Sequence, residues 1–179
     1  MRSFEKDIYR YYGTTKESLT QKIRRPQELK YIILFRKGQA CKSRILRAIY
    51  RRRLKKLSNM THISIFLETE IGEGFYIGHT GRVIINSQAK IGRNVNVATG
   101  CTIGGEYRGE RKGCPTIGNN VWIGTNAVIV GKITIGDDVM IAPNSFVNFD
   151  VPSHSIVVGN PAKIVHKEWA TESYIVNEV

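Results

Sequence analysis

The sequence lacks a long hydrophobic run. Its longest uninterrupted apolar stretch, Tyr31 to Phe35, is far too short to cross a bilayer, and charged residues stand near the N-terminus where a signal peptide would carry its apolar segment. Cysteine is also scarce. Cys41, Cys101 and Cys114 form no CxxC pair of the kind that binds zinc or acts as a redox dithiol. We therefore expect a cytoplasmic protein that is neither secreted nor transmembrane.

Acidic residues are few in the first third of the chain. Residues 1–60 hold 18 Lys and Arg against 4 Asp and Glu, whereas residues 61–179 hold 9 against 11. The whole excess behind the net charge of +12 therefore lies in the N-terminal third. Such a segment can face nucleic acid, anionic lipid or only solvent.

The length of 179 residues, 41% of them hydrophobic, suits one main domain with a smaller appendage. We assign residues 1–60 to a basic helical region, residues 61–165 to the main domain and residues 166–179 to a C-terminal tail. Capping and proline signals predict that the first region forms three helices, near residues 14–25, 26–37 and 40–57.

The third of these helices is basic and amphipathic. Its apolar positions share one face and its basic positions surround the other: Ile45, Leu46, Ile49, Tyr50, Leu54 and Leu57 against Arg44, Arg47, Arg51, Arg52, Lys55 and Lys56. Two interpretations stay open. The helix packs on its neighbours and solvates its cations, or it lies on the anionic inner face of the membrane as a peripheral contact. We expect no nucleic-acid partner, because no binding motif accompanies the charge.

Aliphatic residues recur every six positions in the main domain. They form three runs: Ile65, Ile71, Ile77 and Val83; Ile85, Ile91, Val97 and Ile103; and Ile117, Ile123, Ile129, Ile135, Ile141 and Val147. This period matches neither a helix nor a hairpin sheet. It predicts a triangular solenoid of about four coils, with three short strands to a coil and the aliphatic side chains stacked inside.

Two interruptions break the period. Between Val83 and Ile85 the register slips by two residues, which we expect a tight bulge in the strand to absorb. Between Ile103 and Ile117 lie fourteen positions where six would suffice, so residues 104–116 must leave the coil as an extruded loop. Long loops of this kind are commonly functional.

The stretch from Ile71 to Val165 resembles the hexapeptide-repeat acyltransferases, and within them the serine acetyltransferase-like branch. The motifs that carry the resemblance are HTG before the slip, IGG before the loop and GNPAK near the end of the repeats. The resemblance implies a mainly β fold, a left-handed parallel β-helix with a small N-terminal α-helical region. It also implies a homotrimer that binds acetyl-CoA between adjacent subunits.

His79 occupies the position of that branch's catalytic histidine. An alcohol that attacks a thioester must lose its proton, and an imidazole can accept that proton near neutral pH, so a ternary complex needs no covalent intermediate. The family orients its histidine with an aspartate, whose place Ser64 takes here. Glu68, Glu70 or a backbone carbonyl are the open candidates for the missing partner.

Other positions depart from serine acetyltransferase. Gly113, Cys114 and Pro115 replace the family's Arg-His-Pro, and Gly78 replaces an aspartate that touches the amino acid. These losses favour a neutral acceptor, a sugar hydroxyl of a cell-surface polysaccharide or its precursor. The alternatives are serine O-acetylation and a trimeric membrane-surface scaffold with no enzymatic activity.

The remaining site candidates include positions that map onto the family, such as Gly104, Gly105, Gly124 and Thr125, and charged residues chosen for their position in the loop and after the GNPAK motif. For the acceptor they are Ser64, Glu68, Arg108, Arg111, Lys112 and Cys114, and for acetyl-CoA they are Gly104, Gly105, Gly124, Thr125, Ala142, Lys163 and Lys167. Cys114 is not expected to act as a nucleophile, because direct transfer needs no acyl-cysteine. We expect no metal, since the four histidines do not recur at spacings that would align three of them on zinc.

Overall fold

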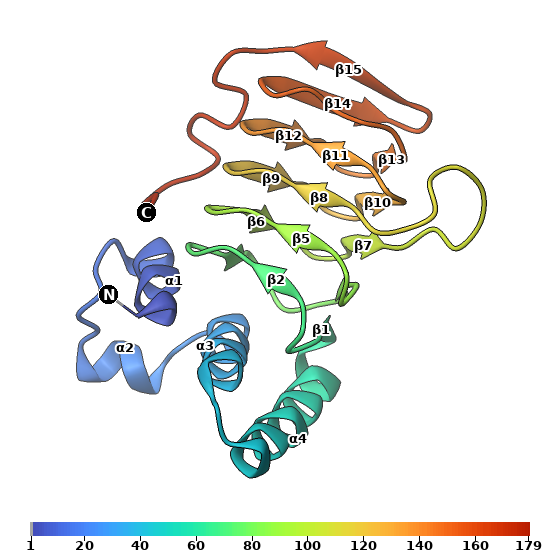
Figure 1. The fold of residues 1–179 in the computed structure, drawn as a ribbon. Helices are drawn as coiled ribbons and strands as arrows, with labels where there is room; N and C mark the ends of the chain where they lie inside the picture. The colour runs from blue at the N-terminus through green and yellow to red at the C-terminus, as the bar shows by residue number, and fades with distance from the viewer. Residues whose placement is uncertain (1) are drawn as a thin grey trace.

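The computed structural model describes residues 2–179, which form a helical base followed by a β-solenoid (Figure 1). The helices are α1 (Ser3–Tyr12), α2 (Leu19–Ile23), α3 (Gln27–Ala40) and α4 (Arg44–Thr61). The helix α1 was not predicted. Ser18 and Gln21 form the capping box of α2, which therefore begins later than the predicted residue 14. The helix α3 continues past Gly38, where a side chain would have met Leu67.

Three sheets form the walls of the solenoid. Sheet 1 contains β1 (Ile63–Ile65), β4 (Val83–Ile85), β7 (Thr102–Gly104), β10 (Val128–Val130) and β13 (Phe146–Val147). Sheet 2 contains β2 (Glu70–Ile71), β5 (Lys90–Ile91), β8 (Thr116–Ile117) and β11 (Thr134–Ile135). Sheet 3 contains β3 (Tyr76–Ile77), β6 (Asn96–Val97), β9 (Val121–Ile123), β12 (Val139–Ile141), β14 (Ser155–Gly159) and β15 (Ala162–His166).

Every strand pairs in parallel with its equivalent one coil further along, except for the antiparallel hairpin of β14 and β15. Equivalent aliphatic residues therefore stack inside the solenoid and are buried, as Ile85 does on Ile103. The predicted hexapeptide-repeat β-helix with an N-terminal helical region is confirmed. It has about five coils instead of four, because Val151 follows Val147 by four residues and the last coil escapes a six-residue search.

The two-residue slip lies in a corner and not in a strand. Val83 and Ile85 are both buried in β4, and Val83 pairs with Ile63 as an ordinary interior position. The surplus falls between β3 and β4, where residues 78–82 form a corner of five residues. The equivalent corners of the next three coils have three residues each, at 98–100, 124–126 and 142–144. The expected bulge is therefore wrong, and the surplus enlarges the corner that carries His79.

The helical base covers the open edge of the first coil. Tyr31 of α3 donates its hydroxyl to the carbonyl of Ile65 at 3.1 Å and accepts the amide of the same residue at 3.0 Å. Tyr11 of α1 binds both backbone groups of Ile77 in the same way, at 2.7 and 3.2 Å. Backbone groups that no coil pairs with are thus satisfied by side chains.

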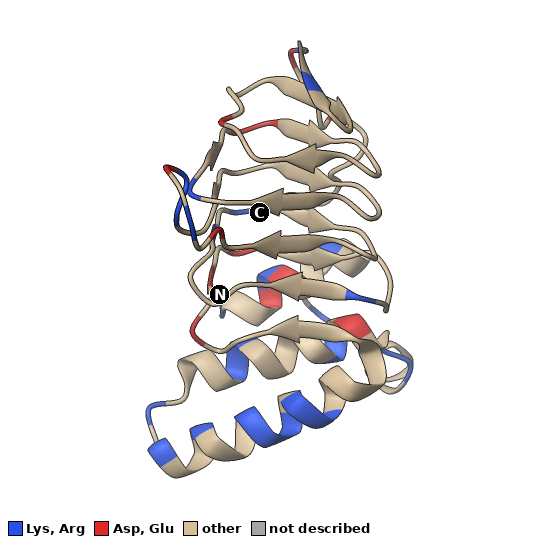
Figure 2. Ribbon diagram, turned by 90° about the vertical axis from the view of Figure 1, so that its right-hand side faces the viewer, with Lys and Arg blue, Asp and Glu red and all other residues tan. Residues whose placement is uncertain are grey.

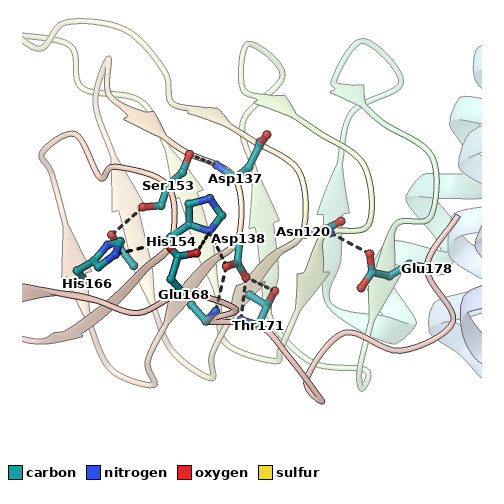
Figure 3. Close-up of polar contacts among 11 residues, drawn as sticks. Asn120, Asp137, Asp138, Ser153, His154, His166, Glu168, Thr171 and Glu178 are labelled. Carbon is teal, nitrogen blue, oxygen red and sulfur yellow. Dashed lines mark hydrogen bonds and ion pairs between the residues drawn. The ribbon is translucent and has the colours of Figure 1, made fainter.

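The C-terminal tail returns along the solenoid from β15 to α1 (Figure 1). Asp138 holds its beginning, since it accepts hydrogen bonds from the amides of Ala170 and Thr171 at 3.0 and 2.9 Å and contacts His154 at 2.9 Å (Figure 3). At its end, the Val179 amide donates to the Asn94 side chain at 3.0 Å. The tail therefore lies against four successive coils.

Gly81 tests the packing of the enlarged corner. Its φ is +136°, and a Cβ at this position would lie 2.1 Å from the Thr99 hydroxyl. We expect Gly81→Ala to lower the free energy of unfolding by about 2–4 kcal/mol in urea denaturation, with part of the loss recovered when Thr99→Ala is added. Gly109→Ala is the matched control. Gly109 also has a positive φ but open space around it, so its cost should be only about 1 kcal/mol. Equal costs at the two glycines would contradict this account.

The Asp138–His154 contact predicts that the attachment of the C-terminal tail to the solenoid depends on pH. The hydrogen bond to Asp138 raises the pKa of His154, so the contact is fully formed below the ordinary histidine value, near 6.5, and is lost as the pH rises through the higher folded value. Burial opposes ionisation of Asp138, but hydrogen bonds from Thr171 and His154 lower its pKa, so it stays ionised throughout.

Hydrogen-exchange protection of the Ala170 and Thr171 amides should therefore fall as the pH rises from 6 to 8. Asp138→Asn should lower the protection and weaken its pH dependence, leaving the part that comes from the 3.6 Å contact of His154 with Glu168, and asparagine tolerates the positive φ at this position. The control is Asp150→Asn, because Asp150 accepts a bond from the Thr134 amide and is not among the charges that raise the pKa of His154. A wild-type tail whose protection ignores pH would contradict the assignment.

Candidate active site

His79 lies on the enlarged corner, which is held from two sides. Below it, Gly81 donates its amide to the carbonyl of Thr61 at the end of α4, at 2.9 Å. Above it, the Thr99 hydroxyl contacts the Thr80 carbonyl at 3.5 Å. The imidazole itself is exposed and makes no hydrogen bond within residues 2–179. A fixed backbone therefore presents a free imidazole to solvent.

The two carboxylates proposed to orient His79 are engaged elsewhere. Glu68 forms ion pairs with Arg51 and, at 3.8 Å, with Arg47, both on α4. Hydrogen bonding from Arg51 lowers the pKa of Glu68. Glu70 lies 3.6 Å from Lys90 on sheet 2. Neither carboxylate is hydrogen-bonded to His79, so no carboxylate in residues 2–179 replaces the family's aspartate.

Ser64 and Glu68 belong to a different hollow. Both line a cleft of about 450 Å³ between α4 and the first strand, together with Tyr31 and Phe66. Ser64 occupies the middle of β1 and pairs with Ile84. Neither residue forms a hydrogen bond or an ion pair with His79, so the structure does not bring these two acceptor candidates to the catalytic candidate.

Three of the acetyl-CoA candidates share the corner column of His79. Gly124 and Thr125 lie at the same corner two coils above His79, and Ala142 lies at that corner one coil higher. Successive coils are separated by one strand spacing of about 4.8 Å, and Ala142 lies three coils above His79. The two residues are therefore about 14 Å apart along the axis of the solenoid. Gly124 is required by this stacking, since a Cβ there would lie 2.7 Å from the Pro143 nitrogen. The column offers a straight edge for a long, thin ligand.

The other two glycines lie at the neighbouring corner with the extruded loop. Gly104 ends β7, and the loop from Gly105 onward projects from the solenoid (Figure 1). Glu106 and Gly113 exchange two backbone hydrogen bonds of 2.9 Å at its base, and the Arg111 carbonyl accepts the Lys132 amide at 2.8 Å. The loop is therefore tied back to the next coil.

The loop carries the remaining charged acceptor candidates. The side chains of Arg108, Arg111 and Lys112 are exposed, and none of them forms an ion pair within residues 2–179. Sheet 1 separates the loop corner from the His79 corner within one chain. The structure thus places the predicted base and the predicted cations at opposite edges of one sheet.

Cys114 is half-buried at the foot of the loop. Its Sγ lies 3.8 Å from the Gln88 side chain, and burial raises the pKa of the thiol. A higher pKa favours the thiol over the nucleophilic thiolate at neutral pH. This environment offers no activation of Cys114 as a nucleophile.

Lys163 and Lys167 lie at the far end of the solenoid. Lys163 is in β15, paired with Val158, and Lys167 follows β15 with its amide bonded to the His154 carbonyl at 2.8 Å. Both side chains are exposed. Because β14 runs parallel to β12, Lys163 lies near the end of the strand that leads to the corner column, whereas Lys167 lies beside His154 at the opposite edge of sheet 3. Only Lys163 is therefore available to phosphate groups beyond the upper end of the corner column.

Thr99 is a site residue that the sequence analysis missed. Its hydroxyl fills the space that the missing side chain of Gly81 leaves. The available signal was a Thr-Gly pair at 80–81 that recurs at 99–100, one coil further along. This pair is not part of the six-residue aliphatic repeat, so the repeat does not reveal it.

Comparison with known proteins identifies several relatives. Residues 114–148 match the family model described as bacterial transferase hexapeptide (six repeats). A serine acetyltransferase of Helicobacter pylori is 36% identical over 133 residues, which cover 70% of this chain and 78% of the relative. Serine acetyltransferase 2 of Arabidopsis thaliana is 39% identical over 62% of this chain, which spans only 34% of that protein.

Solved structures agree with these relatives. The crystal structure of a Neisseria gonorrhoeae serine acetyltransferase in complex with serine has a TM-score of 0.72 and 28% identity, and covers 91% of this chain and 66% of that one. An Entamoeba histolytica serine acetyltransferase in complex with cysteine has a TM-score of 0.70 and 28% identity, with coverage of 93% and 60%.

These findings correct the expected acceptor. The prediction of a hexapeptide-repeat acyltransferase is confirmed, but a polysaccharide-modifying type with a carbohydrate acceptor is wrong, because the matched relatives are serine acetyltransferases. Gly78 and Gly113 misled the inference, since losing particular acceptor contacts does not reveal what replaces them. With 36% identity over 78% of the Helicobacter protein, the chain belongs to the serine acetyltransferase family of hexapeptide-repeat acyltransferases.

Proposed function

We propose that the chain is a serine O-acetyltransferase that moves an acetyl group from acetyl-CoA to the serine hydroxyl. The observation that carries the proposal is the position of His79, at the foot of a corner column that also holds Gly124, Thr125 and Ala142. A thioester that lies along this column would end beside the imidazole. The acceptor is inferred from the relatives, which are named for serine.

His79 acts as the general base in this mechanism. The serine oxygen attacks the thioester carbonyl while the imidazole accepts the hydroxyl proton. The thiolate of coenzyme A then leaves as the tetrahedral intermediate collapses, and it takes up the proton from the His79 imidazolium, which restores the neutral base. The ring has no hydrogen-bond partner within residues 2–179, so a neighbouring subunit or the bound serine must orient it.

The loop supplies the cation for the serine carboxylate. Gly113 has no side chain to replace the family's arginine, but Arg108, Arg111 and Lys112 precede it in the same loop and have no carboxylate partner within residues 2–179. An arginine binds a carboxylate with two hydrogen bonds, so one displaced along the loop can perform the same role.

The active site forms between two subunits of a homotrimer. The His79 corner and the loop corner lie at opposite edges of sheet 1 in one chain. When solenoids pack side by side around a threefold axis, the His79 corner of one subunit faces the loop of the next. Both groups then face one substrate.

The base is tested by His79→Asn. Turnover, followed as thiol release from acetyl-CoA in the presence of serine, should fall about 10²–10⁴-fold while the fold is unchanged, because the side chain is exposed. His166→Asn, at an exposed position in β15, is the matched control and should keep wild-type turnover. Unchanged turnover in His79→Asn would contradict the assignment of His79 as the base. A wild-type protein that releases no thiol with serine would contradict the assignment of serine as the acceptor.

The intersubunit site is tested by complementation. His79→Asn chains are coexpressed with chains that carry Arg108→Ala, Arg111→Ala and Lys112→Ala together. Each of these two kinds of chain should be weakly active when expressed alone. When equal amounts of the two chains assemble at random, about one site in four over all trimers combines an intact base with an intact loop, so activity should recover to about a quarter of wild type. No recovery above the two parents would place both groups of each site in one chain.

A further inference from the structure

The outer side of α4 is an amphipathic surface that the fold leaves uncovered. On its inner side the helix packs against α3 and β1, yet only Leu54 and Thr61 are buried. On its outer side, Ile45 is 77% exposed, Ile49 44% and Met60 64%. The single apolar face predicted for this helix is therefore wrong, because Leu54 is buried on the inner side whereas Ile45 and Ile49 lie outside among the cations. Isolated exposed apolar residues are common, but here three of them share one helix surface.

The charge of α4 has one sign. Its sequence contains seven Lys and Arg and no Asp or Glu. Arg47 and Arg51 pair with Glu68 on the inner side. The other five cations have no ion-pair partner within residues 2–179: Arg44, Arg52, Arg53, Lys55 and Lys56. Figure 2 shows that Lys and Arg are dense on the lower helices and sparse on the coils above them.

We infer that the outer face of α4, defined by Ile45, Ile49, Arg52, Arg53, Lys56 and Met60, binds the surface of an anionic lipid bilayer. The cations contact the headgroups, and the three apolar side chains enter the boundary with the acyl chains. No helix of residues 2–179 is long and apolar enough to span a membrane, so the contact is peripheral.

The combination of charge and apolar area selects lipid over the other occupants. A second copy of this helix would bring seven further cations and no anion, and like charges across an interface repel. The phosphates of a nucleic acid would pair with the cations, but Ile45, Ile49 and Met60 would have no binding partner. An anionic bilayer uses both kinds of side chain on the same face.

The same end of the molecule carries a second, smaller surface that exposes apolar and basic side chains together. The short helix α2 also lies at the helical end (Figure 1), and it exposes Leu19 and Ile23 beside Lys22. Because both helices lie at the end opposite β15, lipid binding would hold the coils upright, with the His79 corner near the membrane and the far coils in water.

The test is co-sedimentation of the full chain with vesicles of phosphatidylcholine containing about one-third phosphatidylserine, at about 0.15 M salt. Pure phosphatidylcholine vesicles measure the neutral background. The triple variant Arg52→Glu, Arg53→Glu, Lys56→Glu should lower the partition coefficient at least about 100-fold. Ile45→Ser with Ile49→Ser should lower it about tenfold while leaving the charge intact.

Matched controls separate the face from overall charge. Lys90→Glu, Arg93→Glu and Lys132→Glu change the net charge equally on exposed positions of the coils and should bind nearly as wild type does. His79→Asn should also bind normally, so this inference and the proposed catalysis can fail separately. Circular dichroism checks that each variant folds, which we expect because the substituted side chains are exposed.

Three results would overturn the inference. If the wild-type protein does not co-sediment with the anionic vesicles, the face does not bind lipid. Equal losses in the helix and coil triple variants would show that net charge alone causes the binding. A variant of α4 that changes the size of the assembly in light scattering, without vesicle binding by the wild type, would assign the face to a second copy.

Discussion

The structure depends on the pairing of each coil with the next. A coil of three short strands has little stability alone, since every backbone amide and carbonyl along its edges needs a partner on the neighbouring coil. The two ends of the stack therefore have to be closed. At the far end the antiparallel strand β15 pairs with β14. At the near end, helices α1 and α3 supply side chains in place of a coil.

A buried ion pair completes the near end. Asp7 and Arg36 are almost fully buried and lie 2.7 Å apart. Each also binds the first coil, since Asp7 accepts the Phe75 amide at 2.9 Å and Arg36 donates to the Ile71 carbonyl at 2.6 Å. An ion pair removed from water is costly unless its remaining groups are bonded, and here the coil provides those bonds. The helical region is thus part of the solenoid's hydrogen-bonding network.

The sequence predicted what repeats and missed what does not. Stacked aliphatic positions such as Ile85 and Ile103 recur at fixed spacing, and the longer interval from Ile103 to Ile117 marks the extruded loop, so both features were predictable from the sequence. Val83 follows Ile77 by six residues, but in the structure it is the first interior residue of β4, two before Ile85, so the aliphatic spacing alone does not distinguish a longer corner from a bulge. The closing of the edge by Tyr31 and Tyr11, and the grip of Asp138 on the tail, join residues far apart in the chain and leave no periodic signal. For the candidate site, His79 was readable from its motif, whereas its missing orienting partner was not.

The position of the enlarged corner follows from the same pairing. A corner in the middle of the stack has a coil on both sides, so extra residues there would separate two sets of paired strands unless they leave as a loop, as residues 105–115 do. The corner at residues 78–82 belongs to the first coil and has the end of α4 beneath it. Gly81 and Val83 donate their amides to the carbonyls of Thr61 and His62, at 2.9 and 3.1 Å. Two surplus residues are therefore accommodated without breaking a strand pair, and the exposed imidazole of His79 is held where the helical base joins the coils.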